Sequence, residues 1–148
     1  MKFNFFKLKP NYKKQSKSEV KNIENLKENE LLEYDKSVDF YYTNLINSLI
    51  LFTYKSDKLK QVEFILIDPL TEIKEEIDYA FLPVCFETIF RNNVIENKYK
   101  EELLNFKKLV DEIPNEIWDY EFIEINEKWT EVKNKAENLL NEAEKALI

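Results

Sequence analysis

The chain of 148 residues contains no glycine and no histidine. Glycine is the residue that most readily adopts a positive φ, which tight hairpins, bulges and phosphate-binding loops require. Histidine is the commonest protein ligand for metals and the usual proton shuttle near neutral pH, so its absence argues against most zinc, hydrolytic and oxygen-activating sites. The double absence predicts helices joined by simple connections, and it leaves carboxylates as the main source of any chemistry.

Length and composition are those of one globular domain. The chain is 44% hydrophobic with 11 Phe, 8 Tyr and 2 Trp, which is enough to bury one sizeable core. The single cysteine, Cys85, lies in the apolar segment 81–86 without a second cysteine to pair with, so we expect an inert buried thiol and a reducing compartment. Residues 1–10 mix lysines with aromatics and do not resemble a signal peptide, and no segment has the length of a membrane span. The expected location is the cytoplasm.

Charge is distributed unevenly along the chain. Residues 1–21 contain seven lysines and one acid, whereas residues 22–148 contain 15 basic and 28 acidic residues. We therefore expect a basic N-terminal arm, residues 1–15, followed by an acidic helical domain, residues 16–148. The acidic domain repels nucleic acid and favours a basic protein partner, mainly through long-range steering. The arm is a solubilising leader, or else a contact for nucleic acid, an acidic membrane or the acidic domain itself.

Helical spacing predicts an all-α, single-domain bundle of about five to seven helices. Capping-box spacing at 16–19 begins a helix over 17–34, and a wide apolar face predicts a central helix over 37–54. Asp68 and Pro69 form a helix start for 70–81, and Pro83 begins the next helix. The nearly continuous apolar run at 62–67 is typical of either a buried helix or a short strand, and we favour the helix.

Two further helices follow in the C-terminal part. Apolar residues three and four apart run from Tyr99 to Ile113, where Pro114 ends the helix. The clearest stripe runs from Phe122 through Ile125 and Trp129 to Leu147. It must pack on other helices or on a second chain, so a homodimer through this helix is one expectation.

An acidic cluster on the predicted helix 70–81 is one candidate site, with partner-binding candidates Glu72, Glu75, Glu76 and Asp78. Glu72 and Glu75 are one turn apart and have the spacing to share a Mg²⁺ ion. Helical nucleoside triphosphate pyrophosphatases use paired ExxE and ExxD motifs, and Glu116 and Asp119 supply the second pair of letters. A proline-broken segment separates the pairs and no basic pattern completes a phosphate site, so we favour a solvated acidic face and predict no metal or cofactor.

The segment 114–122 is the preferred candidate because large aromatics alternate with carboxylates. Tryptophan and tyrosine are enriched in binding hot spots, and carboxylates around them suit a basic groove. The predicted partner-binding centre is Glu116, Trp118, Asp119, Tyr120 and Glu121. For either aromatic taken singly, however, we favour the interpretation that Trp118 or Tyr120 fills a junction between two helices.

The only arginine, Arg91, is followed by Asn92 and Asn93. With so many carboxylates in the chain, a structural ion pair is expected ahead of an anion site.

The residues at 68–72, 78–92 and 113–118 together resemble small acidic bacterial proteins that are encoded as immunity partners of secreted toxins. The resemblance covers about the last two-thirds of the chain and is carried by its general character. It implies a protein that neutralises a toxin by binding it, and it assigns no site residue. The expected function is therefore a non-enzymatic binding protein that neutralises a basic partner, either a toxin or a nucleic-acid-processing enzyme. A carboxylate-based Mg²⁺-dependent nucleotide hydrolase and a self-associating helical scaffold are the alternatives.

Overall fold

The computed structural model describes residues 27–62 and 68–146. Within these ranges all the regular secondary structure is helical and no strand forms, which confirms the predicted all-α fold. The α-helices are α1 Glu28–Asp35, α2 Val38–Phe52, α3 Ser56–Gln61, α4 Pro69–Ala80, α5 Pro83–Arg91, α6 Lys100–Asp111, α7 Tyr120–Ile123 and α8 Glu127–Ala146. Two 3₁₀ turns, η6 Asn97–Tyr99 and η7 Asn115–Ile117, precede α6 and α7.

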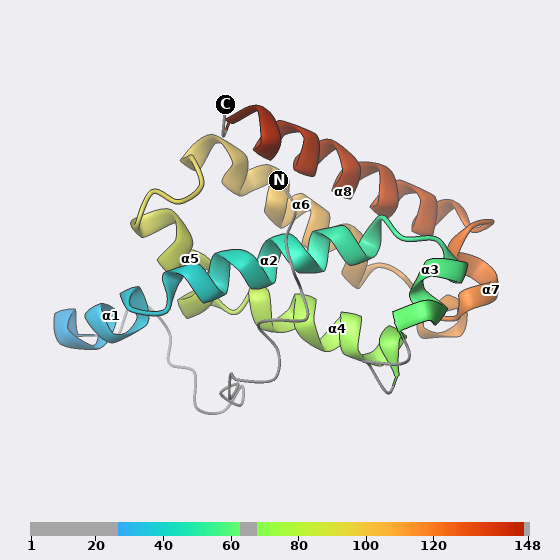
Figure 1. Cartoon of the computed structure of the whole chain (residues 1–148), viewed down its shortest axis with the longest axis horizontal. Coiled ribbons are helices and arrows are strands. Elements are labelled where there is room, and N and C mark those ends of the chain that lie inside the picture. Colours follow the sequence, from blue (N-terminus) through green and yellow to red (C-terminus); the bar gives the residue numbers. More distant parts are fainter. Residues whose placement is uncertain (1–26, 63–67, 147–148) are drawn as a thin grey trace.

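Helix α2 is the centre of the bundle, as its wide apolar face predicts. It packs against α4, α5 and α8, with α4 and α8 on opposite sides of it in Figure 1. Its residues are buried almost all round, including Leu45, Leu49 and Phe52 and the polar Asn47. A helix that touches partners on several sides needs apolar residues around most of its circumference. The bundle is therefore arranged around one long central helix.

The predicted proline signals mark helix starts in the structure. The Asp68 carboxylate accepts hydrogen bonds from the backbone N–H of Thr71 (3.4 Å) and from its hydroxyl (2.8 Å), and Pro69 is the first residue of α4. Pro83 is likewise the first residue of α5. Proline is favoured there because the first helical N–H has no partner within the helix. Local chemistry alone therefore fixes where these two helices begin.

Residues 27–62 and 68–146 form eight α-helices, whereas the sequence predicts five to seven, and two short helices account for the difference. Helix α3 has six residues and α7 has four, too few to produce an apolar stripe in the sequence. The helix expected from residue 122 onward is interrupted before α8, where the Asn126 side chain accepts a hydrogen bond from the N–H of Lys128 (2.8 Å). Ile125, predicted to face inward, is instead 76% exposed, because this break changes the register of the stripe.

After the break, α8 packs as predicted. Trp129, Val132, Ala136 and Leu139 are buried, and the helix contacts α2 and α6 of the same chain. The strand or helix expected at 62–67 lies, beyond Val62, outside the described residues, as do the basic arm at 1–15 and the expected start of the first helix at residue 17.

Candidate functional site

The segment 114–122 forms η7, a short bend and α7, and its aromatic residues point toward the core. The half-buried Trp118 donates a hydrogen bond from Nε1 to the carbonyl of Leu70 (2.9 Å). Its ring centre lies 4.7 Å from that of Trp129 and 6.3 Å from that of Phe52. These contacts are those of a residue that fills a helix junction, which is the interpretation favoured for Trp118 when it is taken singly.

Three other rings complete this packing, and we call the four together the aromatic cluster: Phe52, Phe106, Trp118 and Trp129. The ring centres of Phe52 and Phe106 are 5.5 Å apart with the planes at 83°, an edge-to-face arrangement. Trp129 stacks on Phe52 and donates from Nε1 to the carbonyl of Ile117 (2.7 Å). Both indoles thus combine ring packing with a hydrogen bond to the backbone of another segment. The aromatic cluster fixes η7 against α2, α4 and α8.

The carboxylates of the same segment face outward. Glu116, Asp119 and Glu121 are all exposed. Asp119 is the N-cap of α7, and its side chain accepts a hydrogen bond from the N–H of Tyr120 (2.6 Å). The predicted centre is therefore divided by the fold. Its carboxylates are available at the surface, while Trp118 supports them from beneath.

Helix α3 lies beside α7 and is tied to it by two hydrogen bonds. The backbone N–H of Ser56 donates to Oε1 of Glu124 (3.0 Å), and its hydroxyl donates to the carbonyl of Tyr120 (2.7 Å). The ammonium of Lys60 lies 5.4 Å from the centre of the Tyr120 ring, within cation–π range. These contacts connect residues 60 or more positions apart and hold the two short helices in one arrangement.

Helices α3 and α7 lie together at one end of the bundle (Figure 1). An open hollow lies between these two short helices. We call it the acidic hollow; its lining residues are Ser56, Asp57, Lys60, Asp119, Tyr120, Glu121, Glu124 and Ile125. It contains four carboxylates and one ammonium, and the exposed Ile125 adds an apolar contact. Three of the five predicted centre residues belong to it. Sequence reasoning missed Asp57, Lys60 and Glu124, because no local signal indicates that α3 and α7 are neighbours.

The second predicted cluster does not form one acidic face. Glu75 is exposed and Glu72 is half-buried, but Glu76 is buried in the core with 3% exposure. Asp78 is 3.0 Å from the ammonium of Lys107 on α6. These four carboxylates of α4 therefore have different surroundings, and only Glu75 is exposed.

Lys107 lies between two carboxylates, since its ammonium also contacts Asp111 (2.6 Å). Burial alone would lower the pKa of Lys107, but the hydrogen bonds with Asp111 and Asp78 outweigh it and raise the pKa. The lysine is therefore charged at neutral pH, and its ion pair with Asp78 joins α6 to α4.

The two pairs of acids suited to Mg²⁺ occupy neighbouring elements. Lys74 of α4 donates to the side chain of Asn115 in η7 (3.0 Å), and its ammonium lies 5.5 Å from the centre of the Trp118 ring. Lys74 thus places a positive charge between these elements. Within the described ranges, no group of three or more acidic or cysteine side chains is arranged to hold a metal ion.

The only arginine forms a structural ion pair, as expected. Arg91 Nη2 lies 2.5 Å from Oδ1 of Asp35, and Nε lies 3.1 Å from the same oxygen. Asn92 donates to that oxygen as well (2.8 Å), so the end of α5 holds α1. Burial would raise the pKa of Asp35, but the hydrogen bonds from Asn92 and Arg91 and the charge of Arg91 together lower it.

The thiol of Cys85 is buried in the core with 1% exposure, as the sequence predicts. Burial raises the pKa of Cys85 to about 12, although a hydrogen bond with Tyr79 opposes the shift. A thiol with this pKa is protonated at neutral pH and is not an activated nucleophile.

Comparison with protein-family models, with curated proteins and with solved structures finds no match for this chain. None of the helices within residues 27–62 and 68–146 has the length and apolar character needed to cross a membrane. A functional conclusion therefore depends on the site itself.

Proposed function

We propose that this chain is a non-enzymatic binding protein that neutralises a basic partner, and that the acidic hollow is the centre of the contact. The partner in this proposal is a toxin or a nucleic-acid-processing enzyme. The observation that carries it is the composition of the hollow, in which four carboxylates, one ammonium and an exposed isoleucine share one surface. A chain with a formal net charge of −7 also attracts basic proteins at long range.

Two of these carboxylates make no ion pair within the described part of the chain that a partner would have to break. Asp57 and Glu121 are exposed, and neither takes part in an ion pair among the described residues. Glu124 and Asp119, in contrast, accept hydrogen bonds from backbone N–H groups. Asp57 and Glu121 are therefore the side chains we assign to the lysines and arginines of the partner.

The hollow is supported by a platform that needs little ordering when a partner binds. The aromatic cluster lies beneath η7, and the Ser56 hydrogen bonds join α3 to α7. A surface that is already ordered loses less conformational entropy on association, which favours tight binding. This is the behaviour expected of an inhibitor or immunity protein. We also propose that it acts in the cytoplasm, because its single cysteine forms no intramolecular disulfide.

The experiment is affinity capture with two charge-matched double variants. Asp57→Asn with Glu121→Gln removes two charges from the hollow, and Glu101→Gln with Glu137→Gln removes two exposed charges from α6 and α8. Each protein is immobilised and exposed to a lysate of the source organism at low salt. We expect the unaltered chain and the α6/α8 variant to retain the same basic protein, and the hollow variant to lose most of it.

Equal loss in the two double variants would show that overall charge, rather than the hollow, holds the partner. Capture of no basic protein by the unaltered chain would contradict the proposed function itself. Thermal melts of the free variants check that both are folded.

A further inference from the structure

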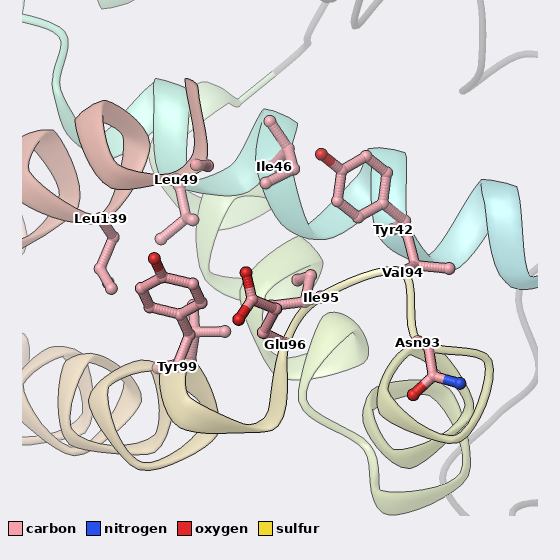
Figure 2. Close-up of a pocket in the computed structure, with 11 residues that line it drawn as sticks. Tyr42, Ile46, Leu49, Asn93, Val94, Ile95, Glu96, Tyr99 and Leu139 are labelled. Carbon is pink, nitrogen blue, oxygen red and sulfur yellow. The ribbon is translucent and has the colours of Figure 1, made fainter. Parts of the chain in front are cut away.

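A second concave site lies between α2, α8 and the connection from α5 to α6. It is a cavity of about 210 Å³ whose walls come from these elements, η6 and α6 (Figure 2). Four aliphatic side chains with exposures of 8% or less form its interior, namely Ile46, Leu49, Leu103 and Leu139. An engineered apolar cavity of about 150 Å³ in another protein binds benzene, so this cavity has room for a ring with a short substituent.

The polar side chains of the cavity come from both sides of it. Tyr42 projects from α2, and Tyr99 projects from η6 toward Leu139 (Figure 2). Burial raises the pKa of Tyr42, so its hydroxyl is protonated at neutral pH. Among the residues that the structure describes, Glu96 is the only charged one that lines the cavity, and its carboxylate points toward α2 between Tyr99 and Ile95. The site therefore combines an apolar interior with aromatic rings and one negative charge.

The connection that carries Glu96 has a defined conformation. Asn93 adopts φ 57°, the left-handed region that asparagine tolerates better than most residues. The N–H of Val94 donates to the carbonyl of Ile89 (3.1 Å), and the N–H of Tyr99 donates to that of Glu96 (3.1 Å). Backbone hydrogen bonds thus hold the main chain of the connection that places Glu96 at the cavity.

The chain's own lysine shows that this carboxylate and ring accommodate an ammonium. Lys98 does not line the cavity, yet its Nζ lies 3.6 Å from Glu96 Oε2 and 5.0 Å from the centre of the Tyr99 ring. The side chains of this ion pair are more than 60% exposed, and such pairs hold together only weakly in water. An ammonium that also buried an apolar group would compete with Lys98 for Glu96.

We propose that this cavity binds a small organic cation, a compact aromatic or aliphatic group that carries an ammonium. The apolar group occupies the interior formed by Ile46, Leu49, Leu103 and Leu139. The ammonium lies against Glu96 and the rings of Tyr42 and Tyr99, as cations do in aromatic recognition sites. Anions of the same size are rejected, because Glu96 and the net negative charge of the chain repel them. The site is separate from the acidic hollow, and the inference does not depend on the proposed function.

The test uses three probes with the same ring: 2-phenylethylammonium, 2-phenylethanol and phenylacetate. Dissociation constants are measured from backbone amide chemical shifts of the full chain at low salt. We expect saturable shifts of the amides of Val94, Glu96 and Leu103 with the ammonium, binding about tenfold weaker for the alcohol, and none for the carboxylate. Equal affinities for the three probes, or no saturable shift with the ammonium, would overturn the proposal.

Matched variants separate the role of Glu96 from that of total charge. Glu96→Gln should weaken binding of the ammonium by about tenfold without changing that of the alcohol, whereas Glu137→Gln on α8 should change neither. Lys98→Gln should strengthen binding of the ammonium, because it removes the competing lysine. If Glu96→Gln and Glu137→Gln have the same effect, or if Lys98→Gln weakens binding, the assignment of the ammonium to Glu96 is wrong.

Discussion

The two ends of α2 are packed in opposite ways. At its C-terminal end, Phe52 is surrounded by the other rings of the aromatic cluster, with Trp129 stacked on it. From its N-terminal part to one turn before Phe52, the face of α2 that carries Tyr42, Ile46 and Leu49 borders a cavity of about 210 Å³. One continuous helix therefore contributes both to a densely packed aromatic cluster and to the wall of an open cavity.

The difference follows from what covers each end. The filled end receives large rings from segments far apart in the sequence, and two indole N–H groups fix those segments by hydrogen bonds. The cavity is covered by the connection 92–96, in which Asn92, Asn93 and Glu96 are exposed and polar. Polar connection residues face water rather than fill the core. Large rings thus supply a rigid support, and a short polar connection leaves a space that a ligand can occupy.

The largest expected effect is the loss of a ring at the filled end. Trp129 is 4% exposed, and Trp129→Ala should lower the free energy of unfolding by about 3–5 kcal/mol, because it leaves a large void and frees the carbonyl of Ile117. Urea denaturation measures this loss. Trp129→Phe keeps a ring and should cost about 1–2 kcal/mol. If Trp129→Ala lowers the free energy of unfolding by less than Trp129→Phe does, the aromatic cluster does not stabilise this end of the bundle.

Removal of an aliphatic side chain that lines the cavity should lower the free energy of unfolding by less. Leu139→Ala should lower the free energy of unfolding by about 2 kcal/mol, the lower end of the usual range, because one side of Leu139 already faces the cavity. Leu45 is fully buried and does not line the cavity, so Leu45→Ala should cost about 4 kcal/mol in the same urea experiment. Equal costs would remove the contrast between the two ends.

The attachment of α1 to α5 is polar and should depend on pH. The pKa of Asp35 is lowered in the folded chain, so its ionisation stabilises the fold above its unfolded pKa, and this contribution is lost as pH falls through the folded pKa below 3.8. Asp35→Asn should cost about 1 kcal/mol at pH 7, and the difference from the unaltered chain should shrink below about pH 4.

The measurement is urea denaturation of both proteins across this pH range. Arg91→Lys keeps the charge but loses the two-nitrogen contact with Asp35, so it should lose part of the same stability. A gap between Asp35→Asn and the unaltered chain that stays constant down to pH 3 would mean that the Asp35 charge does not stabilise the fold.

The smallest expected effect on stability is that of the charges in the acidic hollow. Asp57→Asn with Glu121→Gln should change the free energy of unfolding by no more than about 0.5 kcal/mol, because both side chains are exposed. Thermal and urea denaturation measure the change. A loss of 2 kcal/mol would assign these carboxylates to the scaffold rather than to binding.

The sequence predicts the parts of this fold that depend on local chemistry. Asp68 with Pro69 and Pro83 mark the starts of α4 and α5, and the wide apolar face of 37–54 identifies the central helix. It does not predict α3 or α7, which are too short for periodicity and are held by contacts such as Ser56 with Glu124. The exposure of Ile125 was missed for the same reason, since the break before α8 interrupts an otherwise regular stripe.

For a similar reason, the sequence predicts only part of the candidate site. Asp119 and Glu121 stand in one recognisable segment, but Asp57 reaches the same hollow only because α3 folds against α7. The cavity beside Glu96 leaves no sequence signal, because its volume depends on how the connection 92–96 lies relative to α2 and α8. The sequence predicts that Arg91 forms an ion pair, but it does not identify Asp35 as the partner.

The most direct test of the account is the association rate of the captured basic partner with the unaltered chain and the two charge-matched double variants. We expect Asp57→Asn with Glu121→Gln to slow association several-fold more than Glu101→Gln with Glu137→Gln at low salt, and salt above the physiological range to narrow the difference in rate. Equal association rates for the two double variants at every salt concentration would contradict the assignment of binding to the acidic hollow.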